Sequence, residues 1–531
     1  MCYSPALSPE QRSIRELLRH VHQGLYLHAN PVDGDPITTD ALVMGYESPA
    51  DDSITVKAFV PPCRMEDLGD PSFCAEHGIR FPYAGGSMAK GISSVAMVEE
   101  LGKAGMLGFF GAAGLPLATV EAAIDRLAAG DFPFGINLIH SPHEPDLEQA
   151  LAELFIRKKV RLVEASAFLA LSLPLVRYRL HGIHRSHDGR IVAPNRIIAK
   201  VSREELAEKF FSPPPEKLLR ELLAQGAITP EQAEMAASIP MAQDITAEAD
   251  SGGHTDNRPA LALFPTIQAL SVRMQPRYGN DTRLRVGLGG GIGTPAAAAA
   301  AFAMGAAYIM TGSVHQACVE SGTSDAVREM LAATRQADVT MAPAADMFEM
   351  GVTVQVLKRG TMFPMRAARL YEIYRSCASL DDIAPAERDK LEKTFFKASL
   401  EEIWQQTRSY FLHRDPRQVE RGDRDPKHRM ALVFRWYLGQ AAHWAQDGDP
   451  ARAIDYQIWC GPAMGAFNEW VADSFLADPQ KRRVVTVARN ILFGATIITR
   501  ANFLRCQGVN LPDDVLRQEP LTDAQIKEYV R

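Results

Sequence analysis

From Phe81 onward, short apolar runs alternate with segments in which apolar residues recur at helical spacing. The runs MLGFF, FPFGINLI and VRLVEASA predict buried strands, and the segments 93–104, 117–129 and 145–158 predict helices. One strand and one helix together take about 30 residues, which is typical of parallel strands joined by crossover helices. Roughly eight such units in one run favour an α/β fold of the (β/α)8 TIM-barrel type over an open doubly wound sheet.

The segments before and after this alternation have different patterns, which divides the chain into three predicted parts. We expect an irregular N-terminal segment with short strands at 1–80, the barrel at 81–375 and a helical C-terminal region at 376–531. Within the barrel, Asp188-Gly189 predicts a hairpin turn. A run of three prolines opens a charged stretch of helical pattern, so residues 213–240 are predicted to form a helical insertion over one end of the sheet.

Composition and charge narrow the class of protein. The net charge of −7 and the pI near 6.1 argue against a nucleic-acid-binding protein. The seven cysteines contain no CxxC motif, which argues against a zinc ribbon, a thioredoxin-type site and a disulfide scaffold. The N-terminus lacks the basic and apolar regions of a signal peptide. We therefore expect a reduced, cytoplasmic compartment.

One stretch, Val286–Val319, contains no Asp, Glu, Lys or Arg and is long enough to span a bilayer. It begins GLGGGIGTP, and such a glycine run followed by a proline would not hold a lipid-exposed helix. The better interpretation is a strand, a glycine turn, an alanine-rich helix and a second strand. We expect no membrane span.

The same stretch carries the first candidate binding site. Gly290 and Gly291 follow an apolar strand, with Thr294 placed to cap the next helix, and the following strand ends in Gly312 and Ser313. Glycine turns let backbone N–H groups approach an anion, and a helix N-terminus favours its charge. Two such strand ends in tandem match the phosphate site of a barrel. A Rossmann site is rejected because no acidic residue ends the second strand.

The second candidate site is the segment EADSGGHTD, residues 248–256. Its His254 follows Ser251, Gly252 and Gly253 at an apparent strand end. Histidine is suited to proton transfer near neutral pH, and the two glycines allow close backbone approach to a ligand. We expect His254 to act at a binding site.

Other strand ends supply weaker candidates. They are Gly86 and Met88 in the loop GGSM, Asn137 in FGINLI and Lys200 in RIIAK. The pattern of His181, His184 and His187 resembles a metal site, but these residues fall on a hairpin arm where their side chains would not converge, so no metal is expected.

Several segments identify the chain as similar to a known family. FGINLIHSPHEP, EADSGGHTDNRP, GLGGGIGTP, YIMTGSVHQA and DYQIWCGPAMGAFNEW resemble the PfaD-type enoyl reductases. These are trans-acting flavoproteins of polyketide and polyunsaturated fatty acid synthases, and they are relatives of nitronate monooxygenases and of the flavin-dependent enoyl-acyl carrier protein reductase. The resemblance runs from about residue 80 to residue 475.

This resemblance implies an FMN site, with the phosphate on Gly290, Gly291, Gly312 and Ser313 and the flavin ring near Gly86, Met88, Asn137 and Lys200. It places His254 beside the reacting carbons. From the two glycines before His254 we also expect the backbone at Ser251, Gly252 and Gly253 to lie against the flavin. It also implies that the insertion at 213–240 is a lid that shapes an acyl tunnel. The chain departs from the family at Gly86-Ser87-Met88, where Ala-Met-Ala is expected.

We therefore expect an FMN-dependent reductase that uses NADPH, or NADH, to reduce enoyl thioesters carried by acyl carrier protein domains. His254 would polarise the thioester carbonyl or protonate the α-carbon. Two alternatives stay open: a nitronate monooxygenase-like enzyme that uses the same histidine as a base, and a catalytically idle scaffold that docks on a synthase. A homodimer is a further option.

Overall fold

The computed structural model describes residues 14–29, 42–45, 56–141, 144–279 and 282–530. Its centre is a closed barrel of eight parallel strands, and the last strand pairs with the first. In chain order the strands are β4 (Tyr83–Gly85), β5 (Leu107–Phe110), β6 (Gly135–Ile139), β7 (Leu162–Ser166), β10 (Arg196–Val201), β11 (Asp244–Glu248), β13 (Arg285–Gly289) and β14 (Ile309–Thr311). The predicted (β/α)8 barrel is confirmed.

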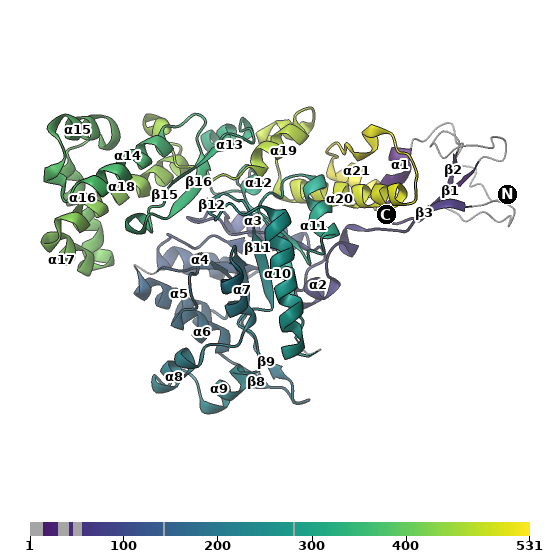
Figure 1. Cartoon of the computed structure of the whole chain (residues 1–531), viewed down its shortest axis with the longest axis horizontal. Coiled ribbons are helices and arrows are strands. Elements are labelled where there is room, and N and C mark those ends of the chain that lie inside the picture. Colours follow the sequence, from purple (N-terminus) through teal and green to yellow (C-terminus); the bar gives the residue numbers. More distant parts are fainter. Residues whose placement is uncertain (1–13, 30–41, 46–55, 142–143, 280–281, 531) are drawn as a thin grey trace.

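Helices between these strands cover the outside of the barrel (Figure 1). They are α3 (Val95–Lys103), α4 (Leu117–Ala128), α5 (Pro145–Arg157), α6 (Leu173–Leu180), α7 (Glu204–Phe211), α10 (Ala260–Met274) and α11 (Pro295–Ala303). The short helix α12 (Ser313–Gln316) follows the last strand, β14. Each amphipathic helix buries one face; in α4 the buried positions Val120, Ala123, Ile124 and Leu127 follow helical spacing. The charge-free stretch 286–319 folds as strand, helix and strand, as its glycines predicted.

The predicted insertion is helical and contains α8 (Glu216–Ala224) and α9 (Pro230–Ala236). It joins the end of α7 to the start of β11, so it lies at the amino ends of the barrel strands. Figure 1 shows it beside the hairpin of β8 (His184–Arg185) and β9 (Ile191–Val192), which forms around the predicted Asp188-Gly189 turn. In a parallel barrel, ligand sites lie at the opposite, carboxyl ends of the strands.

Beyond the last barrel strand, α13 (Asp325–Ala332) leads into a small antiparallel sheet that the sequence did not predict. In it, β16 (Thr353–Leu357) pairs with β15 (Val339–Pro343) and with β12 (Gly253–His254), which rises from the barrel loop after β11. The sheet lies between the barrel and the helices that follow (Figure 1). It therefore fixes His254 at the seam between these two parts.

Residues 363–447 form a helical unit with its own apolar core. It consists of α14 (Phe363–Ser376), α15 (Pro385–Lys390), α16 (Leu400–Arg414), α17 (Pro416–Arg424) and α18 (Pro426–Asp447), with a π-helical turn at Leu391–Phe396. Trp404, Phe434 and Tyr437 are buried in that core. The helical character predicted for the region after residue 376 is confirmed.

The C-terminal helices return to the barrel and are α19 (Ala463–Val471), α20 (Val484–Cys506) and α21 (Asp523–Tyr529). Helix α20 is long and apolar enough to cross a membrane, but most of it is buried inside the protein. Its Arg500 donates hydrogen bonds to the carbonyls of Val21 and Gln23. We interpret α20 as a core helix of the fold.

The N-terminal elements lie at the same end of the molecule as α20 and α21 (Figure 1). They are α1 (Ile14–Arg19), β1 (Leu25–Ala29), β2 (Leu42–Gly45), β3 (Val56–Val60) and α2 (Pro71–His77). The three strands form an antiparallel sheet in the order β2-β1-β3. Short strands were expected in this segment.

A buried ionic network holds the amino ends of β11 and β13. The Arg285 guanidinium donates to both carboxylate oxygens of Asp244 at 2.6 and 3.0 Å, and to Glu76 at 2.6 Å. His77 contacts the same Asp244 at 2.9 Å. Burial alone would raise the pKa of Asp244, but the charges of Arg285 and His77 lower it to about 2. The stability that the carboxylate contributes is present at neutral pH and is lost as the pH falls toward that value.

Removing this carboxylate tests the network. Asp244→Asn leaves a buried Arg285 without its main counter-charge, so the free energy of unfolding should fall by about 3–5 kcal/mol. Urea denaturation followed by circular dichroism measures the change. The control Asp131→Asn, on the exposed surface, should hardly move the midpoint. Equal midpoints for the two variants would show that the network does not stabilise the barrel.

Candidate active site

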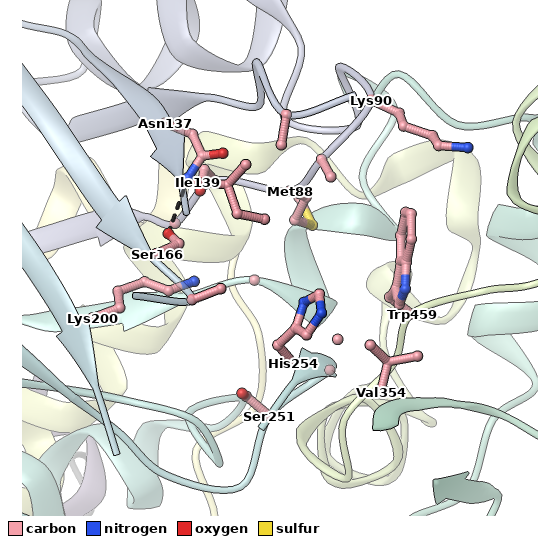
Figure 2. Close-up of a pocket in the computed structure, with 18 of the residues that line it drawn as sticks. Met88, Lys90, Asn137, Ile139, Ser166, Lys200, Ser251, His254, Val354 and Trp459 are labelled. Atoms are coloured by element: carbon pink, nitrogen blue, oxygen red, sulfur yellow. Dashed lines mark hydrogen bonds between the residues drawn. The ribbon is translucent and has the colours of Figure 1, made fainter. Parts of the chain in front are cut away.

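A pocket of about 330 Å³ opens at the carboxyl ends of the barrel strands. One wall comes from the barrel loops, and the other comes from the small sheet, the helical unit and the segment 457–463. The pocket brings together the residues that the sequence predicted to bind the cofactor or to act in catalysis: Gly86, Met88, Asn137, Lys200, Ser251, Gly252, Gly253, His254, Gly290, Gly291, Gly312 and Ser313. Figure 2 shows His254 between Lys200 on one side and Trp459 on the other.

The glycines after β13 and β14 form a cradle in one corner of the pocket. Gly290 has φ +83°, and a Cβ added there would lie 2.5 Å from the carbonyl oxygen of Ala249. At Gly312 an added Cβ would meet no heavy atom within 4 Å, so the backbone faces open space. Thr294 caps α11 as predicted, its side chain accepting the N–H of Ala297. The corner has the shape and the backbone donors that a phosphate group requires.

The turn before His254 is held against β16 and against the segment that follows it. Gln355 donates to Asp250 and to the carbonyl of Ser251, both at 2.7 Å. A Cβ on Gly252 would lie 2.9 Å from the backbone of Cys460, so only glycine fits there. The buried Oγ of Ser251 has no hydrogen-bond partner among the described residues and lines the pocket. A buried hydroxyl in that position is suited to bind a polar ligand.

His254 is oriented by a carboxylate from the loop between β15 and β16. Its Nε2 lies 3.2 Å from Oδ1 of Asp346, and its side chain is 29% exposed. Burial alone would lower the pKa of His254, but the charge and the hydrogen bond of Asp346 outweigh burial and raise it. The histidine is therefore well suited to donate a proton or a hydrogen bond into the pocket.

Polar side chains cover the floor of the pocket. Asn137 donates to Oγ of Ser166 at 3.0 Å (Figure 2). Lys200 forms an ion pair with Glu248 at 3.1 Å. Burial alone would lower the pKa of Lys200, but the charges of Glu248 and Glu164 outweigh burial and raise it. Lys200 therefore places a positive charge at the floor.

The departure from the family pattern at Ser87 has a structural counterpart in Glu164. Both the backbone N–H and the hydroxyl of Ser87 donate to Oε2 of this glutamate, which is fully buried on β7. Burial raises the pKa of Glu164, against the opposing charge of Lys200. The hydroxyl of Ser87 is thus engaged by a buried acid below the pocket.

The structure corrects the predicted substrate lid. No residue of 213–240 lines the pocket, because the insertion lies at the amino ends of the strands. The wall that faces the barrel comes instead from Arg414 of α16, from Leu438, Gly439 and Ala442 of α18, and from Trp459. Sequence reasoning had treated these aromatic-rich helices as a separate region.

Sequence reasoning also missed Glu164, Asp346 and Trp459. Glu164 had a usable signal, a carboxylate inside the apolar run LVEAS. Trp459 belongs to the segment DYQIWCGPAMGAFNEW, which carried the family resemblance but received no role. Asp346 reaches His254 only through the unpredicted sheet. No group of three or more potential metal-binding side chains was found within the described ranges.

Fold and pocket define a (β/α)8-barrel protein with a pocket at the carboxyl ends of its strands. The chain is 38% identical to the crystallised enoyl reductase domain of MlnA from the macrolactin cluster of Bacillus amyloliquefaciens, with a TM-score of 0.79 over 83% of this chain and 100% of that one. It belongs to the PfaD-type enoyl reductase family of polyketide and polyunsaturated fatty acid synthases.

Curated relatives are longer than this chain. One of the polyunsaturated fatty acid synthase subunits of Thraustochytrium sp. is 46% identical over 94% of this chain, and the match covers 33% of that relative. Polyketide biosynthesis protein PksE of Bacillus subtilis is 43% identical over 82% of this chain and 56% of its own length. Residues 377–456 match the family model described as the inserted helical domain of [acyl-carrier-protein] S-malonyltransferase.

The pairing of His254 with Asp346 can be tested by titration. Asp346→Asn removes the charge that outweighs burial, so the pKa of His254 should fall. Histidine side-chain NMR measures it, with the His254 signal identified by its absence in His254→Ala. The control Asp256→Asn removes a charge on the same loop that pairs with Arg203 rather than with His254. An unchanged pKa in Asp346→Asn would contradict the pairing.

Proposed function

We propose that this chain is an FMN-dependent, NADPH-using enoyl reductase that acts on α,β-unsaturated thioesters carried by acyl carrier protein domains. The observation that carries the proposal is the pocket itself, in which a glycine cradle and an ion-paired histidine face one cavity. The similarity to the whole crystallised enoyl reductase domain of MlnA supports the reaction type.

The residues of the pocket fit FMN. The open cradle at Gly290, Gly291, Gly312 and Ser313 suits a single phosphate, and the unpartnered hydroxyl of Ser251 suits a polar group of the cofactor. Gly86, Met88, Asn137 and Lys200 line the part of the pocket that would hold the flat ring. When bound, the flavin supplies the hydride that a reduced nicotinamide nucleotide provides.

His254 acts on the thioester side of the reaction. Addition of hydride at the β-carbon builds negative charge on the thioester oxygen and the α-carbon. A protonated His254 can donate a hydrogen bond to that oxygen or a proton to that carbon. Asp346 holds the ring in place and favours its protonated form.

The nitronate monooxygenase alternative needs the same histidine as a base. A raised pKa makes His254 a better donor at neutral pH, which favours the reductase over that alternative. The flavin content of the purified protein distinguishes the enzyme from the idle scaffold, because a scaffold does not need a glycine cradle that binds a cofactor. Carrier domains as partners, a cytoplasmic location and a homodimer remain predictions.

If the glycine cradle binds the FMN phosphate, a negative charge introduced there should weaken FMN binding. Because a side chain at Gly312 meets open space, Gly312→Asp should fit sterically and place a carboxylate against the phosphate. FMN affinity should fall by roughly tenfold or more through like-charge repulsion. The matched control Gly312→Asn has nearly the same shape without the charge and should keep most of its flavin. Visible absorbance of the purified variants measures occupancy, and full occupancy in Gly312→Asp would place the phosphate elsewhere.

The role of His254 predicts unequal effects on the two half-reactions. His254→Ala should bind FMN and accept hydride from NADPH at a nearly normal rate, because that step builds no enolate. Reoxidation by crotonyl-acyl carrier protein should slow by roughly 10²–10⁴-fold. Anaerobic stopped-flow absorbance at the flavin band resolves the two steps. Equal slowing of both would indicate a structural or nicotinamide-binding histidine, and unchanged reoxidation would remove it from catalysis.

A further inference from the structure

Besides His254, two lysines and one arginine line the pocket: Lys90, Lys200 and Arg414. Lys200 is paired with Glu248 at 3.1 Å, and Arg414 is paired with Glu144 at 2.7 Å. Within the part of the chain that the structure describes, Lys90 forms no ion pair; its Nζ donates only to the carbonyl of Gly439, at 3.0 Å. An ammonium has three hydrogens to donate, so Lys90 has donors left for a ligand.

The loop after β4 holds Lys90 in a backbone conformation that side chains rarely adopt. Lys90 has φ +57°, where glycine would be the default residue. Its N–H donates to the carbonyl of Ala113 at 2.7 Å, and its own carbonyl accepts from Gln446 of α18 at 2.7 Å. A strained, tightly held residue at a binding site points to a function that requires its side chain.

The surroundings of Lys90 compensate its charge only in part. It lies at the seam where the barrel loop meets α18, with Gly439 opposite and Trp459 on the same side of the pocket (Figure 2). Burial lowers the pKa of Lys90 to about 8, and the charge of Asp447 offsets only part of that effect. The neighbouring His443 has its own pKa lowered by burial and by the charge of Lys90. An anion at this seam would favour the charged lysine.

We propose that Lys90 binds a phosphate group of the ligand that enters between the barrel and the helical unit. Lys90 lies in the loop after β4, whereas the residues of the glycine cradle follow β13 and β14. Two ligands of the proposed function carry such a group: the phosphopantetheine arm of a carrier protein and the nicotinamide dinucleotide. The identity of these two ligands rests on the proposed function, whereas the anion site rests on Lys90 alone.

Calorimetric titration of the flavin-loaded protein tests the site. The probes are two pairs: 4′-phosphopantetheine with pantetheine, and NADP⁺ with nicotinamide riboside. Lys90→Met should weaken at least one phosphate-bearing probe by about tenfold or more, because a charge-assisted hydrogen bond is lost. The affinity for the phosphate-free member of that pair should change much less. Lys90→Arg should retain most of the affinity.

Two further variants separate binding from folding. Lys90→Gly adopts φ +57° without strain, so it should stay folded and lose affinity as Lys90→Met does. The control Lys103→Met removes a charge from an exposed lysine on α3 and should leave every affinity unchanged.

The outcomes assign the source of the phosphate. Loss confined to the first pair identifies the carrier arm, and loss confined to the second identifies the dinucleotide. Unchanged affinity of Lys90→Met for both phosphate-bearing probes would overturn the proposal, as would equal weakening of both members of each pair or loss of the flavin. A protein that shows the phosphate effect but reduces no enoyl thioester would refute the proposed function and leave the anion site intact.

Discussion

The pocket depends on a close backbone contact between the turn before His254 and the segment after β16. An added Cβ on Gly252 would lie 2.9 Å from Cys460, and one on Gly461 would lie 2.8 Å from the backbone nitrogen of Gly252. Gly293 approaches the carbonyl of Ala463 in the same way, at 2.5 Å. Side chains at these glycines would push the segments apart. The C-terminal chain can therefore close the cavity only because these positions lack a Cβ.

This contact joins two kinds of wall. The barrel supplies the glycine cradle and the polar floor, which are rigid because they follow hydrogen-bonded strands. The sheet and the helical unit supply the opposite side, and they bring Asp346 to His254 and Gly439 to Lys90. The ion pairs follow the same division. Lys200 pairs with Glu248 within the barrel, and His254 pairs with Asp346 across the seam between the barrel and the small sheet. The electrostatics of the histidine thus depend on how the two parts are joined.

Local sequence patterns were sufficient for the barrel and for much of the pocket. Apolar strands ending in glycine, a Thr294 cap and polar residues at strand ends are signals contained in a few neighbouring positions. The parallel topology then brings strand ends together without further information. Asp346 could not be found in this way because it meets His254 only through pairing of β12 with β16, about a hundred residues apart in the chain. Long-range pairing leaves no periodic signal near either residue.

The misplaced lid has a related cause. The sequence shows that 213–240 is helical, but which end of the barrel it covers depends on whether it follows a strand or a helix. It follows α7, so it lies at the amino ends, beside the strand ends that Asp244 and Arg285 hold together.

The helices that do reach the cavity, α16 and α18, were interpreted as a separate unit because their aromatic residues fill a core of their own. A helix can serve both purposes when one face packs inward and a few small residues, such as Gly439 and Ala442, line the pocket. If a ligand binds at the seam as proposed, its selectivity is therefore expected in α16, α18 and Trp459, whose side chains can vary without disturbing the strands that carry the glycine cradle.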